Sequence, residues 1–108
     1  MENIGCVIYA ETSNGIKAEW LLSNNNKITR GTGIGTRLNP TNKKKDFEGE
    51  YEITYSDING KESPKLKLNI SFESDCYKLT WIYNGTVTGI GIGIKNNNKL
   101  SVGWFKVN

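Results

Sequence analysis

The chain has no histidine, and its 108 residues include only two cysteines, two prolines and one methionine. Histidine is the commonest general base and metal ligand, and the usual partner of a serine or cysteine nucleophile. The two cysteines, Cys6 and Cys76, lie far apart in the sequence and form no metal-binding motif. Carboxylates or tyrosine–lysine pairs can also do chemistry, but none stands out here. We therefore expect no enzyme activity, no catalytic residues, no metal and no cofactor.

Long apolar runs and blocks of one charge are also missing. No stretch reaches the about 18 apolar residues of a membrane helix, and Met1 to Ala10 lack the pattern of a signal peptide. The net charge is only +3, and acidic residues directly follow the single basic run, Lys43 to Lys45. We expect a cytoplasmic protein with neither membrane nor nucleic acid as partner. The alternative is a secreted protein whose signal peptide has been removed. Abundant lysine, asparagine and isoleucine indicate an AT-rich genome, such as that of a bacterium or a phage.

Turn signals recur at regular intervals. Asn-Gly pairs tolerate the positive φ angles of type I′ turns and are the strongest short signal for a β-hairpin. They occur at Asn14-Gly15, Asn59-Gly60 and Asn84-Gly85. Further turns are predicted at the asparagine triplets 24–26 and 96–98, at Ser74-Asp75, and across 39–46. The turns divide the chain into about eight segments, none of which shows helical periodicity.

Loop lengths predict which residues face each other. Two-residue loops at 59–60, 74–75 and 84–85, with a three-residue loop at 96–98, place the large apolar residues of five strands on one face. A slip of one residue would move a whole strand's set to the other face. The predicted inward residues are Phe47, Tyr51, Ile53, Tyr55, Leu66, Leu68, Ile70, Phe72, Tyr77, Leu79, Trp81, Tyr83, Thr88, Ile90, Ile92, Ile94, Leu100, Val102 and Trp104.

The first third of the chain follows the same scheme less regularly. A two-residue loop at Asn14-Gly15 aligns Tyr9 with Trp20, and a three-residue loop at 24–26 aligns Trp20 with Arg30. This register predicts that Arg30 and Ile34 point inward.

Glycine alternates with other residues in two segments, 31–36 and 89–94. A phosphate-binding loop needs its glycines between a strand and a helix, and no helix follows here. The predicted register places both glycine ladders on the outer face. There, glycine allows either bending of the strand or the close approach of a partner.

Short connections between antiparallel strands favour closure, which removes exposed strand edges. The sequence predicts an all-β chain, residues 1–108, with one domain: a single antiparallel up-and-down β-barrel of about eight strands. The run formed by Tyr77 to Trp81, Asn84-Gly85, Gly89 to Gly93 and Leu100 to Trp104 resembles the avidin-like and lipocalin-like barrels. It is most similar to small bacterial proteins of unknown function. The resemblance covers the last third of the chain and carries no biotin-specific or lipocalin-specific residue.

One end of the barrel is predicted to form a mouth with an aromatic floor and polar rim, which is typical of a ligand pocket. The expected ligand is a small anionic or aromatic molecule. The alternative is a barrel filled by its own aromatic residues, serving as an oligomeric interaction module that uses its outer surface. The predicted ligand-binding residues are Arg30, Tyr55, Trp81, Tyr83, Thr88, Trp104 and Lys106.

Closure of the barrel also brings apolar residues together outside. Ile4, Cys6, Ile8 and Leu21 then lie near Phe105, and an apolar patch of this kind is rare on a monomer. We expect a homodimer or higher oligomer. The same topology separates the two cysteines beyond disulfide distance and predicts two free thiols.

Overall fold

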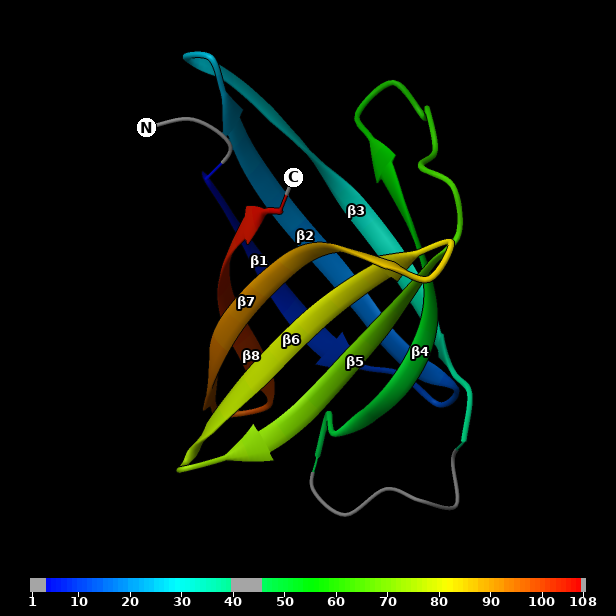
Figure 1. The fold of residues 1–108 in the computed structure, drawn as a ribbon, viewed down its shortest axis with the longest axis vertical. Helices are drawn as coiled ribbons and strands as arrows, with labels where there is room; N and C mark the ends of the chain where they lie inside the picture. The colour runs from blue at the N-terminus through cyan, green and yellow to red at the C-terminus, as the bar shows by residue number, and fades with distance from the viewer. Residues whose placement is uncertain (1–3, 40–45, 108) are drawn as a thin grey trace.

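The computed structural model describes residues 4–39 and 46–107, and it confirms an all-β chain (Figure 1). Each strand pairs antiparallel with the next, and the first pairs with the last, so the sheet closes into an up-and-down barrel. None of the described residues belongs to a helix that could cross a membrane. The Lys43 to Lys45 run, and most of the turn predicted across 39–46, lie outside the described residues. The eight strands are β1 (Ile4–Glu11), β2 (Gly15–Asn24), β3 (Lys27–Arg37), β4 (Gly49–Asp57), β5 (Leu66–Glu73), β6 (Cys76–Tyr83), β7 (Thr86–Asn96) and β8 (Lys99–Lys106).

Two-residue turns with positive φ join several hairpins. The predicted turns at Ser74-Asp75 and Asn84-Gly85 are confirmed, with φ of 52° and 66° in the first and 50° and 76° in the second. The three-residue loops predicted at the asparagine triplets are wrong. Asn24 pairs with Lys27, and Asn96 pairs with Lys99, so each loop has two residues. The first asparagine of each triplet stays in its strand because the remaining two suffice for a tight turn.

The other two Asn-Gly turns are longer than predicted. Glu11 pairs with Ile16, and Thr12 Oγ1 accepts a hydrogen bond from the Gly15 amide, so Tyr9 meets Ala18 rather than Trp20. In the β4–β5 connection the Asp57 carboxylate accepts hydrogen bonds from the amides of Asn59 and Lys61. An aspartate that caps its own turn in this way widens the loop.

Both glycine ladders face the barrel interior, which is opposite to the prediction. On β3 the shorter turn pairs Trp20 with Gly31, and on β7 a bulge between Trp81 and Ile82 pairs Trp81 with Gly89. The alternating isoleucines therefore point outward, and Ile92 is 65% exposed. The prediction that Ile34, Ile90, Ile92 and Ile94 face inward is wrong.

The remaining inward rows agree with the sequence prediction along β5, β6 and β8 and for Tyr51 and Ile53 of β4. The cysteines are both free thiols, as predicted: Cys6 is exposed on β1 and Cys76 begins β6. The buried core consists of Val7, Tyr9, Ile16, Ala18, Phe47, Tyr51, Ile53, Leu68, Ile70, Tyr77, Leu79, Trp81, Leu100 and Val102.

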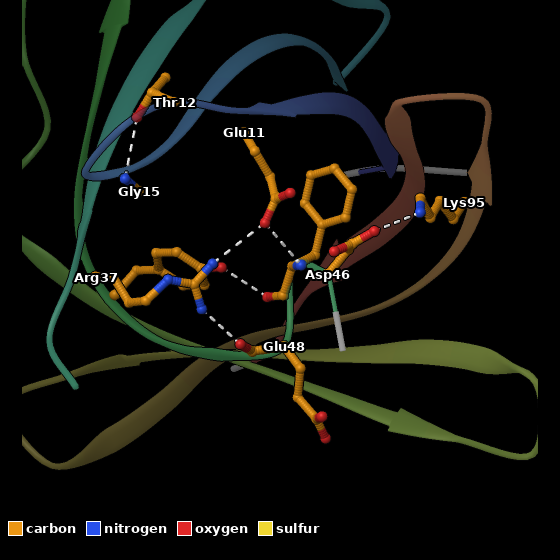
Figure 2. Close-up of polar contacts among 9 residues, drawn as sticks. Glu11, Thr12, Gly15, Arg37, Asp46, Glu48 and Lys95 are labelled. Atoms are coloured by element: carbon orange, nitrogen blue, oxygen red, sulfur yellow. Dashed lines mark hydrogen bonds and ion pairs between the residues drawn. The ribbon is translucent and has the colours of Figure 1, made fainter. Parts of the chain in front are cut away.

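A polar cluster closes the end of the barrel that holds the β1–β2 turn (Figure 2). The Glu11 carboxylate accepts hydrogen bonds from the Phe47 amide at 3.1 Å and from the Arg37 guanidinium at 3.3 Å. Arg37 also donates to the Glu48 carbonyl at 2.6 Å and lies 4.8 Å from the centre of the Tyr51 ring. Phe47 is 1% exposed, so these contacts hold an aromatic plug in place.

Replacing Glu11 with alanine should destabilise the plug, because the Arg37 guanidinium and the Phe47 amide both lose an acceptor. We expect a loss of about 1–3 kcal/mol in the free energy of unfolding, measured by urea denaturation. Glu19→Ala removes an exposed carboxylate of β2 and should change stability by less than about 0.5 kcal/mol. Equal losses in the two variants would show that the cluster does not hold the plug.

Candidate functional site

The opposite end of the barrel is open. This end holds the β2–β3 turn, the start of β1 and the end of β8 (Figure 1). A cavity of about 560 Å³ opens into the barrel at this end, above the buried core. Ligand pockets commonly measure roughly 300–1,000 Å³. The cavity is lined by Val7, Trp20, Leu22, Tyr55, Asp57, Lys61, Glu62, Ser63, Pro64, Leu66, Trp81, Tyr83, Thr88, Gly89, Trp104 and Lys106.

The structure brings together most of the residues predicted for the site. Tyr55, Trp81, Tyr83, Thr88, Trp104 and Lys106 all line the cavity. The prediction that Arg30 joins them is wrong. Arg30 pairs with Leu21 on the outer face, because the two-residue turn at Asn25-Asn26 shifts β3 by one position. The mouth therefore has one cation fewer than expected.

The predicted register places Pro64 opposite Tyr55, but sequence reasoning missed the rest of the wall formed by the β4–β5 connection, Lys61, Glu62 and Ser63. Residues 61–63 lie between two strands, where strand alternation does not fix the direction of a side chain. The signal available was the length of the segment, since no strand pattern begins before Leu66. Ser63 is tied to β4 because its Oγ accepts a hydrogen bond from the Tyr55 amide at 3.0 Å. The connection is thus held against the mouth.

Each tryptophan of the cavity lies opposite a glycine on a neighbouring strand. Trp20 pairs with Gly31, and Trp81 pairs with Gly89. Trp104 lies between two glycines, Gly5 on β1 and Gly91 on β7.

These glycines leave the space that the indole rings occupy. A Cβ at Gly31 would lie 2.7 Å from Trp20 Cζ2, and one at Gly91 would lie 3.2 Å from Trp81 Cζ3. The rings therefore rest against bare backbone, and the centre of the barrel mouth stays free.

Hydrogen bonds fix two of the three indoles. Trp20 Nε1 donates to the Thr32 carbonyl at 2.8 Å, and Trp81 Nε1 donates to the Tyr55 hydroxyl at 2.7 Å. The centres of the Trp81 and Trp104 rings are 5.7 Å apart, with their planes at 48°. The aromatic floor is therefore positioned before any ligand binds.

The Tyr55 hydroxyl also contacts the hydroxyl of fully buried Tyr9 at 2.6 Å. Burial raises the pKa of Tyr55 to about 12, and burial likewise raises the pKa of Tyr9 well above its ordinary value. Both hydroxyls therefore keep their protons at neutral pH.

Charges at the rim balance each other. The lining includes Asp57 and Glu62 as well as Lys61 and Lys106. With Arg30 outside, the mouth has no excess of positive charge to attract an anion. In the described part of the chain, no group of three or more aspartate, glutamate or cysteine residues could hold a metal ion.

A second hollow of about 550 Å³ lies outside the barrel, beside the β6–β7 turn. Its walls include the outward residues Glu52, Lys67 and Ile82, and no aromatic side chain lines it. We take the cavity inside the barrel as the candidate site, since its aromatic lining offers far more apolar contact.

Comparisons with protein-family models, with curated proteins and with solved structures find no match for this chain. The structure is consistent with a small closed β-barrel and places the chain in no family. Any function must therefore be argued from the cavity and the surface themselves.

Replacing Gly5 with alanine should disturb the cavity, because the added methyl group would lie under 3.0 Å from the Trp104 ring. The ring must move toward the lumen, which should cost about 1–3 kcal/mol of stability and change the tryptophan emission. Gly103→Ala, compared at chain concentrations too low for self-association, is the matched control, since nothing lies within 4 Å of its added methyl group within the chain. Urea unfolding and fluorescence spectra that do not distinguish the two variants would contradict this packing.

Proposed function

We propose that this protein is a non-enzymatic β-barrel that binds one small aromatic molecule in the cavity at its open end. The observation that carries the proposal is the preformed floor of Trp20, Trp81 and Trp104 inside a cavity of about 560 Å³. An eight-stranded barrel is just wide enough to hold one small ligand, as lipocalins and streptavidin do.

A neutral ligand is favoured over an anionic one. The case for an anion needed Arg30 and Lys106 together, and Arg30 lies on the outer face. Asp57 and Glu62 at the rim oppose the remaining cations. Aromatic rings, in contrast, can stack or pack edge to face on the indoles of the floor.

Two fluorescent probes test this proposal. N-phenyl-1-naphthylamine is neutral, and 1-anilinonaphthalene-8-sulfonate is its sulfonated, anionic counterpart. We expect saturable binding of one neutral probe per chain and weaker binding of the anion. Tighter binding of the sulfonate would contradict the assignment of a neutral ligand.

Paired variants show where the probe binds. Leu22 lines the cavity, so Leu22→Trp should fill it and weaken binding of the neutral probe by about tenfold or more, equivalent to about 1.4 kcal/mol. Leu21 is its neighbour on the outer face, so Leu21→Trp should leave binding unchanged. Loss of binding only in Leu21→Trp would place the probe outside the barrel.

The outer face of β1, β8 and β7 supports a second candidate function, that of an oligomeric interaction module. On these three strands, three neighbouring cross-strand rows of outward residues carry no charge. Ile8, Ile92 and Phe105 are 42%, 65% and 52% exposed. The rows are Ile4–Phe105–Ile90, Cys6–Gly103–Ile92 and Ile8–Ser101–Ile94.

We propose that a second copy of this chain covers this face. Phe105 protrudes, while nothing lies within 4 Å of a Cβ placed on Gly103, two positions away on the same strand. A two-fold axis would seat each Phe105 over the partner's Gly103, the reciprocal contact of an isologous dimer.

Sedimentation at tens of micromolar tests this dimer. The wild type should sediment as a dimer, and Phe105→Asp should be monomeric because it buries an unpaired charge in the interface. Ile34→Asp, on exposed β3 surface away from this face, should remain dimeric. A monomeric wild type would rule the dimer out, and a dimer resistant to Phe105→Asp would place the interface elsewhere.

A further inference from the structure

A chain of three polar groups runs from the core to the cavity. Tyr9 is 0% exposed, and its hydroxyl lies 2.6 Å from that of Tyr55. Trp81 Nε1 lies 2.7 Å from the same Tyr55 hydroxyl. An indole N–H can only donate, whereas each tyrosine hydroxyl has one hydrogen and can also accept. Tyr55 therefore accepts from Trp81, and the direction of the Tyr9–Tyr55 bond remains to be assigned.

The two possible directions of this hydrogen bond differ in which hydroxyl hydrogen is left without an acceptor in the chain of three groups. If Tyr55 donated to Tyr9, the Tyr9 hydrogen would need another acceptor inside the core, and a buried donor without one is strongly disfavoured. If Tyr9 donates, the Tyr55 oxygen accepts from both Tyr9 and Trp81. The Tyr55 hydrogen is then left over, and Tyr55, unlike Tyr9, lines the cavity. The second direction leaves no donor stranded in the core.

Three neighbouring polar groups of the cavity are already engaged. Trp20 Nε1 donates to the Thr32 carbonyl, and the Thr88 hydroxyl donates to the Trp81 carbonyl at 3.4 Å. The Ser63 hydroxyl donates to the Pro64 carbonyl at 2.8 Å. Burial keeps the pKa of Tyr55 at about 12, so its hydroxyl stays protonated.

We propose that the Tyr55 hydroxyl is the hydrogen-bond donor of the cavity, and that the ligand is a flat aromatic molecule with one uncharged acceptor, such as a ring nitrogen or a carbonyl oxygen. The inference rests on the proposed ligand-binding function and specifies the chemistry of the ligand. The acceptor lies at the Tyr55 hydroxyl, and the aromatic body packs among Trp81 and Trp104. A donor buried beside indoles discriminates well, because a ligand without an acceptor leaves it unpaired.

Naphthalene and quinoline test this assignment, because they have the same shape and differ by one ring nitrogen. Their dissociation constants are measured at pH 8, where quinoline is uncharged, by quenching of tryptophan fluorescence. The quantity compared is the dissociation constant of naphthalene divided by that of quinoline. This ratio should be about three- to tenfold higher in the wild type than in Tyr55→Phe. Tyr9→Phe is the matched control. It breaks the same hydrogen bond between the two tyrosine hydroxyls but keeps the Tyr55 donor, so its ratio should stay close to that of the wild type.

The outcomes separate this inference from the function on which it rests. Failure of both probes to bind the wild type would overturn the ligand-binding function and this inference together. Binding of both probes with the same ratio in Tyr55→Phe would overturn only the role of Tyr55, and would place the donor elsewhere, for instance at the Trp104 indole.

A measurement on the wild type alone covers the case in which Tyr55→Phe does not fold. The carbonyl stretch of bound 1-acetylnaphthalene should move to lower frequency than in hexane, because the oxygen accepts a hydrogen bond. An unshifted band would overturn the proposal.

Discussion

The structure depends on the packing of large aromatic rings against strands that carry no side chain at the point of contact. Trp20, Trp81 and Trp104 each lie opposite glycine on a neighbouring strand, and Tyr55 lies opposite Gly33 in the same way. A Cβ at Gly33 would lie 2.7 Å from the Tyr55 ring. Because interiors are densely packed, each of these rings needs a missing side chain beside it.

The same alternation shapes both surfaces of the barrel. With glycine pointing inward on β3 and β7, the residues between the glycines must point outward, and several of these are isoleucines. Inside, the glycines leave room for a cavity with an aromatic floor. Outside, the isoleucines of β7 join Phe105 and Ile8 in an apolar face. The candidate ligand site and the candidate dimer face are therefore two consequences of one sequence pattern.

Turn chemistry and strand alternation were enough to predict the number of strands, closure, and the inward rows of β5, β6 and β8. They failed on β3 and β7, where hydrophobicity favoured isoleucine inside and the space required by the neighbouring rings was not visible in the sequence. On β7 a bulge beside Trp81 and a shorter turn at Asn97-Asn98 shift the register in opposite senses, so β8 was still placed correctly. For the site, six of the seven predicted residues line the cavity, and Arg30 was lost to the shift on β3.

The most direct test of this account is the environment of the glycine ladder on β7 in solution. Nuclear Overhauser effects between protons measure which groups lie within a few ångströms of each other. The Hα protons of Gly89 and Gly91 should give strong effects to the indole protons of Trp81 and Trp104, while the methyl groups of Ile90 and Ile92 give none. Strong effects from those isoleucine methyls to the indoles would show that the isoleucines face inward, and would contradict the packing on which the cavity and the outer face both depend.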